Sequence, residues 1–208
     1  MDLFVNSLIA LVSIVNPLGA VPLFLALTPT YTQKDRSRSA RQTSIYSVLI
    51  LGGFFLAGAA ILGFFGISLQ AVRIAGGIII LNSGFSLLNG RFEQSRAVNE
   101  KVKEEALHRA DISFTPMAMP MLSGPGSISF LISAFAEHQN WVSRGWIGLA
   151  IIVTGIIIYL ILRSSAYLHR MMGETGLKVI SRIMGFLVMA IGTQYIIAGI
   201  YQLINDLN

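Results

Sequence analysis

Two stretches of the sequence place proline, glycine and polar residues in the middle of long apolar segments. The first is VNPLGAVP at residues 15–22, and the second is LSGPGS at residues 122–127. Proline has no backbone N–H and clashes with the carbonyl four residues before it, so it interrupts a helix and frees carbonyl groups. A helix that restarts there leaves its first N–H groups without acceptors. Such N–H groups bind anions and freed carbonyls bind cations, so the two stretches predict a binding site for a small zwitterion.

Both stretches have the form of a helix start. At residues 16–17 and 123–125, a small polar residue or glycine precedes a proline, which is typical of an N-cap followed by the first helical residue. Two such starts facing one another would each offer roughly half a positive charge to a carboxylate. The amides of Asn82 and Gln194, in two other apolar segments, either bind the rest of the substrate or hydrogen-bond to a neighbouring helix. The candidate substrate-binding residues are Asn16, Pro17, Gly19, Asn82, Ser123, Gly124, Pro125, Gly126, Ser127 and Gln194.

Other kinds of chemistry lack the residues that they need. The chain has no cysteine, and its histidines, His108, His138 and His169, are expected in loops. No Asp, Glu, His or Lys falls inside an apolar segment, so we predict no catalytic residue, no metal site and no intramembrane proton relay. We therefore expect neither an enzyme nor a cofactor. If transport is coupled to a cation, that cation is Na⁺ or H⁺, held by freed carbonyls or by Asp111 or Glu137.

Six uncharged apolar segments provide the elements that would position the site. Because 54% of the residues are hydrophobic, 12% are charged and the mean hydropathy is +0.69, the chain departs from soluble domains. A helix needs about 20 apolar residues to cross a hydrocarbon core. The sequence predicts an all-α polytopic membrane protein with six transmembrane helices, of which the first and fourth are broken mid-membrane. The segments lie at about residues 3–28, 45–67, 74–90, 112–136, 145–162 and 183–205.

The basic residues lie mostly on one side of this six-helix arrangement. Of the 15 Lys and Arg residues, all but Arg73 and Arg144 fall in the connections after the first, third and fifth helices. Positive residues collect on the cytoplasmic side, so we predict a multi-pass protein of the cell inner membrane with both termini outside. An arrangement in which the first and fourth segments are re-entrant distributes the charges less unevenly and stays open. The net charge of +5 therefore needs no nucleic-acid partner.

The two halves of the chain resemble one another. LQAVRIAGG at residues 69–77 aligns with LKVISRIMGF at residues 177–186 at an offset of 108 to 109, and Pro17 aligns with Pro125 at the offset of 108. Since each half holds an odd number of helices, the second half enters the membrane inverted relative to the first. The predicted organisation is a three-helix repeat at residues 1–90, a charged cytoplasmic linker at 91–111 and a second three-helix repeat at 112–208.

Four blocks of the sequence, IVNPLGAVPLFLALTP, GISLQAVRIAGGIIIL, FTPMAMPMLSGPGSIS and ISRIMGFLVMAIGTQYIIAGI, resemble the MarC family of membrane proteins, also called the neutral amino acid transporter family. The match spans nearly the whole chain, and the pattern NPxGxxPxF at Asn16–Phe24 and the pattern MPxxxGPG at Met119–Gly126 are its specific elements. The resemblance implies six membrane spans. For some members it also implies movement of small neutral amino acids such as glycine, alanine or serine.

Together, the residues and the resemblance predict a secondary transporter of small neutral amino acids. The substrate carboxylate would bind at the two helix starts, and the substrate is expected to be a zwitterionic amino acid. A channel or exporter for another small polar solute and a non-transporting membrane scaffold remain as alternatives. The sequence leaves the oligomeric state open.

Overall fold

The computed structural model describes residues 1–89 and 111–207, and these residues form helices and connections without a strand. The predicted linker lies outside the described residues except for Asp111. The helices are α1 (Asp2–Val15), α2 (Val21–Leu27), α3 (Gln33–Phe65), α4 (Leu69–Leu88), α7 (Pro125–Glu137), α8 (Trp141–Arg163) and α9 (Ser165–Leu207), and an irregular helical segment, η1 (Ser113–Leu122), precedes α7.

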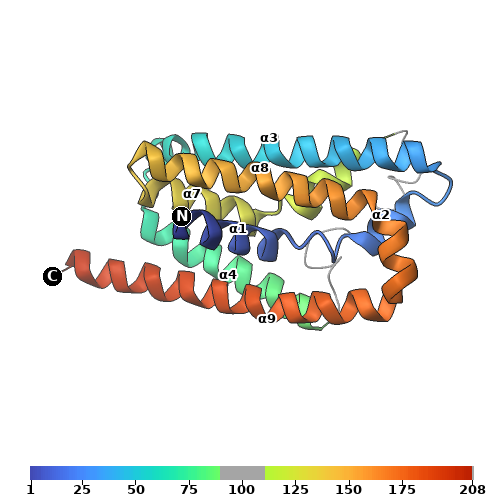
Figure 1. Ribbon diagram of the computed structural model, residues 1–208. Helices are drawn as coiled ribbons and strands as arrows, with labels where there is room; N and C mark the ends of the chain where they lie inside the picture. Colours follow the sequence, from blue (N-terminus) through green and yellow to red (C-terminus); the bar gives the residue numbers. More distant parts are fainter. Residues whose placement is uncertain (90–110, 208) are drawn as a thin grey trace.

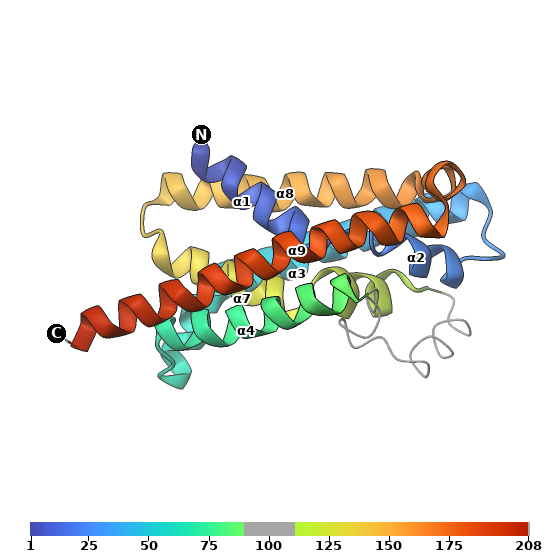
Figure 2. The ribbon, with the colours of Figure 1, turned by 90° about the horizontal axis from the view of Figure 1, so that it is seen from below.

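The long helices run along one common direction and enclose the interrupted ones. Figure 1 shows α3 and α8 along one side of the bundle and α4 and α9 along the other, with α1, α2 and α7 between them. The contacts agree, because α3 packs on α7, η1 and α8, α1 packs on α8, and α4 packs on α7 and α9. The view turned by 90° in Figure 2 shows α9 crossing the whole length of the molecule. The interruption between α1 and α2 and the interruption between η1 and α7 are therefore surrounded by continuous helices.

Three helices of the described residues, α4, α8 and α9, are long and apolar enough to cross a membrane. The pair η1 and α7 passes the same test only when taken together, and it bends by 64° at the break. α1 is apolar but has only 14 residues. The protein is thus an all-helical membrane protein with three candidate spans, or four if the bent pair counts as one, where the sequence predicts six.

Apolar side chains cover much of the outer surface of the bundle. Leu49 on α3, Ile78 on α4 and Ile156 on α8 are 64%, 54% and 52% exposed. A soluble protein would bury more of such side chains, whereas a surface against lipid tails gains nothing by hiding them. The exposed apolar surface therefore fits a bilayer around the bundle.

Two helices extend beyond the predicted apolar segments. α3 begins at Gln33 rather than near residue 45, because the basic segment QKDRSRSARQTS contains no proline or glycine to stop it. Thr32 caps this end by accepting a hydrogen bond from the Asp35 N–H. α9 likewise begins at Ser165 and bends at Gly173, whose φ of 64° is open to glycine. Much of the basic sequence is therefore helical rather than loop.

Glycines bring α4 and α9 into backbone contact. A Cβ placed on Gly77 would lie 2.8 Å from the Gly192 carbonyl oxygen, and one on Gly84 would lie 2.7 Å from the Gly185 carbonyl oxygen. Real Cβ atoms do not approach an oxygen so closely, so only glycine fits at these crossings. This seam, defined by Gly77, Gly84, Gly185 and Gly192, fixes α4 against α9.

Candidate functional site

The first break separates α1 from α2. α1 ends at Asn16, whose backbone is left-handed, with φ 47° and ψ 65°, and whose N–H donates to the Val12 carbonyl oxygen. Asparagine tolerates this conformation better than most residues other than glycine. α2 begins only at Val21, with Pro22 in its first turn. The prediction that Asn16 caps a new helix with Pro17 as its first residue is therefore wrong: Asn16 ends a helix.

The Asn16 side chain is buried and only half satisfied. Asn16 is 1% exposed, and its Oδ1 accepts a hydrogen bond of 3.3 Å from the Gly19 N–H. Among the described residues, its Nδ2 has no hydrogen-bond partner. A Cβ on Gly19 would lie 2.6 Å from this Nδ2 and 3.1 Å from the Ser181 Oγ of α9, so glycine makes the space that the amide occupies. An unpaired buried donor costs about 1–3 kcal/mol, which calls for a compensating role.

The second break separates η1 from α7. Within η1, Thr115 and Met119 are extended and each precedes a cis proline. α7 begins as the sequence predicts, with Gly124 as the N-cap and Pro125 as the first helical residue. The Ser127 hydroxyl donates to the Gly124 carbonyl oxygen at 2.8 Å. The N–H groups of Gly126 and Ser127 have no acceptor within the helix, because they belong to its first turn.

The two breaks lie close together, about halfway along the bundle (Figure 1). A Cβ on Gly126 would lie 3.7 Å from Ile14 Cγ2, two residues before Asn16, and 3.1 Å from Ile80 Cγ1 of α4. The side of Gly126 on which a Cβ would stand is thus covered by Ile14 and Ile80. Eight of the ten candidate residues, at 16, 17, 19 and 123–127, therefore lie around these breaks.

The two breaks do not form the matched pair that the sequence predicts. α2 has seven residues, too few for a helix dipole that could hold an anion at its N-terminus. Some carbonyls near the prolines are also occupied, because the Leu18 oxygen accepts from the Val21 N–H and the Ile112 oxygen accepts from the Met117 N–H. The arrangement offers one helix start, that of α7, and one side-chain donor, Asn16 Nδ2.

Asn82 and Gln194 lie apart from the breaks. Both are exposed, because each comes two residues after a packed position, Ile80 or Gly192, and so points to another side of its helix. Gln194 lines a cavity of about 380 Å³ between α1, α7 and α9, whereas Asn82 does not. This outer cavity extends from Leu3 and Glu137 to Ala10 and Phe130, and it is lined by Asn6, Ser7, Gln194 and Tyr195 as well.

A charged contact at the outer cavity is missed by the sequence analysis. Arg73 Nη2 lies 2.5 Å from Glu137 Oε2, and Arg73 Nη1 donates to Gln202 Oε1 at 2.8 Å, so α4, α7 and α9 are tied together. The three residues are far apart in the sequence and no local pattern links them. Asp111, the other candidate acid, accepts a hydrogen bond from the Ser113 N–H. Among the described residues, no group of three His, Cys, Asp or Glu could hold a metal ion.

Comparisons with known proteins give one consistent result. The model of a family described as MarC family integral membrane protein matches residues 1–204. A UPF0056 membrane protein of Methanocaldococcus jannaschii is 39% identical over 202 residues, which cover 96% of this chain and 98% of that protein. The UPF0056 inner membrane protein MarC of Citrobacter koseri is 35% identical over 217 residues, covering 99% of this chain and 98% of that protein. No solved structure matches the chain.

Proposed function

The chain belongs to the MarC family of integral membrane proteins, and on that premise we propose that it is a secondary transporter of small neutral amino acids across the inner membrane. The substrate is a zwitterion of the size of glycine, alanine or serine. Its carboxylate binds between the two breaks, at Asn16 and at the start of α7. The protein has no catalytic residue, and a coupling cation, if one is used, is Na⁺ or H⁺.

The observation that carries this proposal is the unpaired amide of Asn16. A donor that is buried and without a partner at a chain break is costly unless a ligand completes it. The Gly126 and Ser127 N–H groups at the start of the 13-residue α7 add further donors and the positive end of a helix dipole. A carboxylate accepts from several donors at once, and therefore fits this set better than a neutral solute does.

The neighbours of the site limit the size of the substrate. Ile14 and Ile80 cover Gly126, so a bound amino acid must displace them and has room only for a small side chain. The outer cavity provides the route, because its inner end at Ala10 and Phe130 lies on the same helices, α1 and α7, that lead to the breaks. Gln194 lies on that route and can hydrogen-bond to the passing substrate.

The seam between α4 and α9 supports two inverted repeats. Gly185 and Gly192 stand 108 positions after Gly77 and Gly84, which is the offset of Pro17 to Pro125 and of the start of the alignment of residues 69–77 with 177–186; the end of that alignment is offset by 109. The contacts join Gly77 to Gly192 and Gly84 to Gly185, so exchange of the two halves converts one contact into the other. This is the relation expected of a two-fold axis in the membrane plane. We therefore propose six membrane passages in two inverted repeats, with both termini outside.

Uptake by the purified protein in liposomes tests the proposal. Labelled glycine, alanine and serine are supplied under imposed sodium or proton gradients, and saturable uptake with counterflow is expected for a carrier. Linear uptake without counterflow indicates a channel, transport of other polar solutes alone indicates a different substrate, and the absence of any flux indicates a scaffold. Each of these results contradicts the proposal.

Three asparagine variants test the site itself. Asn16→Asp keeps the acceptor for the Gly19 N–H but replaces the donor with a negative charge, so we expect uptake to fall by about 100-fold. Asn16→Gly keeps the left-handed backbone but removes both the donor and the Oδ1 acceptor of the Gly19 N–H, so uptake should fall by about tenfold. The control is Asn140→Asp, since Asn140 caps α8 with its Oδ1 and aspartate caps equally well. Equal uptake by all three variants would remove Asn16 from the site.

A further inference from the structure

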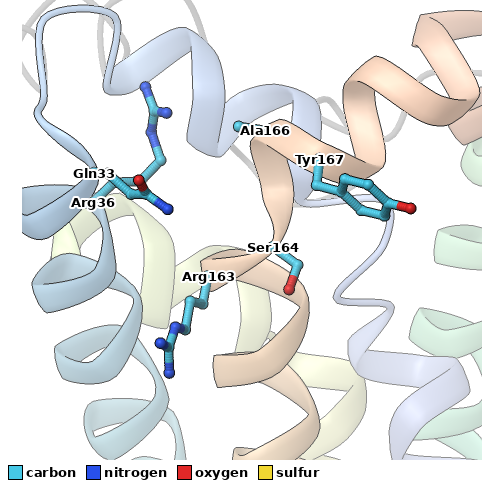
Figure 3. Close-up of a pocket in the computed structure, with 6 residues that line it drawn as sticks. All are labelled: Gln33, Arg36, Arg163, Ser164, Ala166 and Tyr167. Carbon is cyan, nitrogen blue, oxygen red and sulfur yellow. The ribbon is translucent and has the colours of Figure 1, made fainter.

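A second cavity lies at the end of the bundle where α3 begins, α8 ends and α9 begins. Its volume is about 460 Å³, within the range of roughly 300–1,000 Å³ typical of ligand sites. Figure 3 shows Gln33 and Arg36 on one side and Arg163, Ser164 and Tyr167 on the other. Within the described part of the chain, the lining includes two guanidinium groups and several uncharged polar groups but no carboxylate. The cavity is therefore positively charged.

Both arginines are held in place without being neutralised by a described acid. Arg36 donates from Nε to the Thr28 Oγ1 at 3.2 Å and from Nη2 to the Thr28 carbonyl oxygen at 2.8 Å. Arg163 donates from Nη1 to the Tyr159 hydroxyl at 3.0 Å. Among residues 1–89 and 111–207, neither forms an ion pair, and the nearby Asp35 carboxylate accepts from the Thr32 hydroxyl instead. Each guanidinium keeps N–H groups for a further acceptor.

The cavity stands at the level of a lipid headgroup. Arg163 is the last residue of α8, a helix that is long and apolar enough to cross a membrane. On the exposed side of α8, Ile152, Ile156 and Leu160 precede Arg163 at helical spacing, and each is 52% exposed. A molecule with its anionic group at Arg163 could therefore lay an acyl chain along this stripe.

We propose that this cavity binds the phosphate of an anionic phospholipid. Arg163 donates to the phosphate oxygens from the end of α8, and Arg36, whose guanidinium is turned toward Thr28, adds its positive charge from the start of α3. Gln33, Ser164 and Tyr167 supply neutral hydrogen bonds to the rest of the headgroup, and the acyl chain packs on the α8 stripe. The bound lipid would link the start of α3 to the connection between α8 and α9.

Native mass spectrometry of the purified full chain tests this proposal. The protein is mixed with equal amounts of phosphatidylglycerol and phosphatidylcholine of the same chain length, and we expect preferential retention of phosphatidylglycerol. Arg163→Gln is the first variant, because Arg163 is exposed and its only described partner is Tyr159. Loss of one charge-assisted contact should weaken retention by about tenfold. Arg36→Gln should do the same, but it also loses the bonds to Thr28.

The matched control is Arg170→Gln, which removes the same charge from an exposed residue that does not line the cavity. Its retention of phosphatidylglycerol should equal that of the unchanged protein. Inorganic phosphate is added separately at millimolar concentration. If it displaces the lipid and stabilises the protein to the same extent, the site takes soluble phosphate and the lipid assignment is overturned. Equal retention of the two lipids, or equal losses in Arg163→Gln and Arg170→Gln, also overturns it.

Discussion

The break between α1 and α2 leaves a side-chain donor unpaired among the described residues, whereas the Ser127 hydroxyl at the break between η1 and α7 is paired. At the first break, Asn16 Nδ2 is buried and has no hydrogen-bond partner in the described part of the chain. At the second, the Ser127 hydroxyl closes on the Gly124 carbonyl oxygen, which also accepts from the Ile128 N–H. Both sequences contain proline and glycine between apolar segments, so the same composition has produced one break whose polar side chain is paired and one whose side-chain donor is not.

This difference separates two uses of an irregular backbone within a membrane. A break whose side chain is paired shapes the helix and offers only its first-turn amides to a ligand. At a break with an unpaired buried side-chain donor, a bound ligand can supply the missing hydrogen-bond acceptor. We therefore expect substrate affinity to depend more on the first break, and the stability of the fold to depend on both.

The largest difference is expected between matched alanine substitutions of the two glycines. In Gly19→Ala, the new Cβ would lie 2.6 Å from Asn16 Nδ2 and must displace it, so we expect loss of uptake and destabilisation by about 1–3 kcal/mol. In Gly126→Ala, the Cβ would lie 3.1 Å from Ile80 Cγ1, and a small shift of Ile80 relieves the contact. Uptake assays and thermal unfolding in detergent measure both effects. Similar losses in the two variants would show that the breaks are equivalent.

A smaller difference in uptake is expected between substitutions of the two polar side chains at the breaks, Asn16 and Ser127. Ser127→Ala removes a hydroxyl whose acceptor keeps another donor, so we expect a cost of about 0.5–1.5 kcal/mol in stability and little change in uptake. Uptake by Ser127→Ala is compared with uptake by Asn16→Gly in the same liposomes. A loss of uptake as large as that of Asn16→Gly would make the Ser127 hydroxyl a substrate ligand.

The smallest effect is expected for the two amides that lie away from the breaks. Gln194→Leu removes a polar group from the outer cavity and should lower uptake severalfold, whereas Asn82→Leu removes an exposed amide and should leave uptake unchanged. The thermal stability of Asn82→Leu should change by no more than about 0.5 kcal/mol. Uptake kinetics distinguish the two variants, and reduced uptake by Asn82→Leu would return that residue to the site.

The sequence predicts the places of the breaks because proline and glycine act locally. It also predicts the start of α7, because proline is common in a helix only in its first turn and Gly124 directly before Pro125 can serve as the N-cap. It fails at Asn16, because asparagine can end a helix in the left-handed conformation as well as begin one. The sequence itself contains the helical phase that turns Asn82 outward: Gly77 and Gly84 mark the packed face of α4, and Asn82 is not in register with them.

Contacts between distant segments could not be predicted in the same way. The approach of Ser181 to Gly19 and the pair of Arg73 with Glu137 depend on how α9 and α4 pack, and no spacing within one element encodes them. The sequence analysis expects the basic residues of α3 and α9 in connections between helices, because they lie outside the apolar segments. Helix formation needs no apolar residues where a cap and good helix formers are present.

The glycine seam between α4 and α9 determines where the protein can yield. Two helices whose backbones touch at glycines lose this close packing when they separate, so we expect α4 and α9 to move as one unit. The short pieces α1, α2 and α7 have no such backbone lock on their neighbours. Alternating access to the two membrane faces would then come from tilting α1, α2 and α7 against the fixed pair of α4 and α9. Substitutions at the glycine seam would then block this motion.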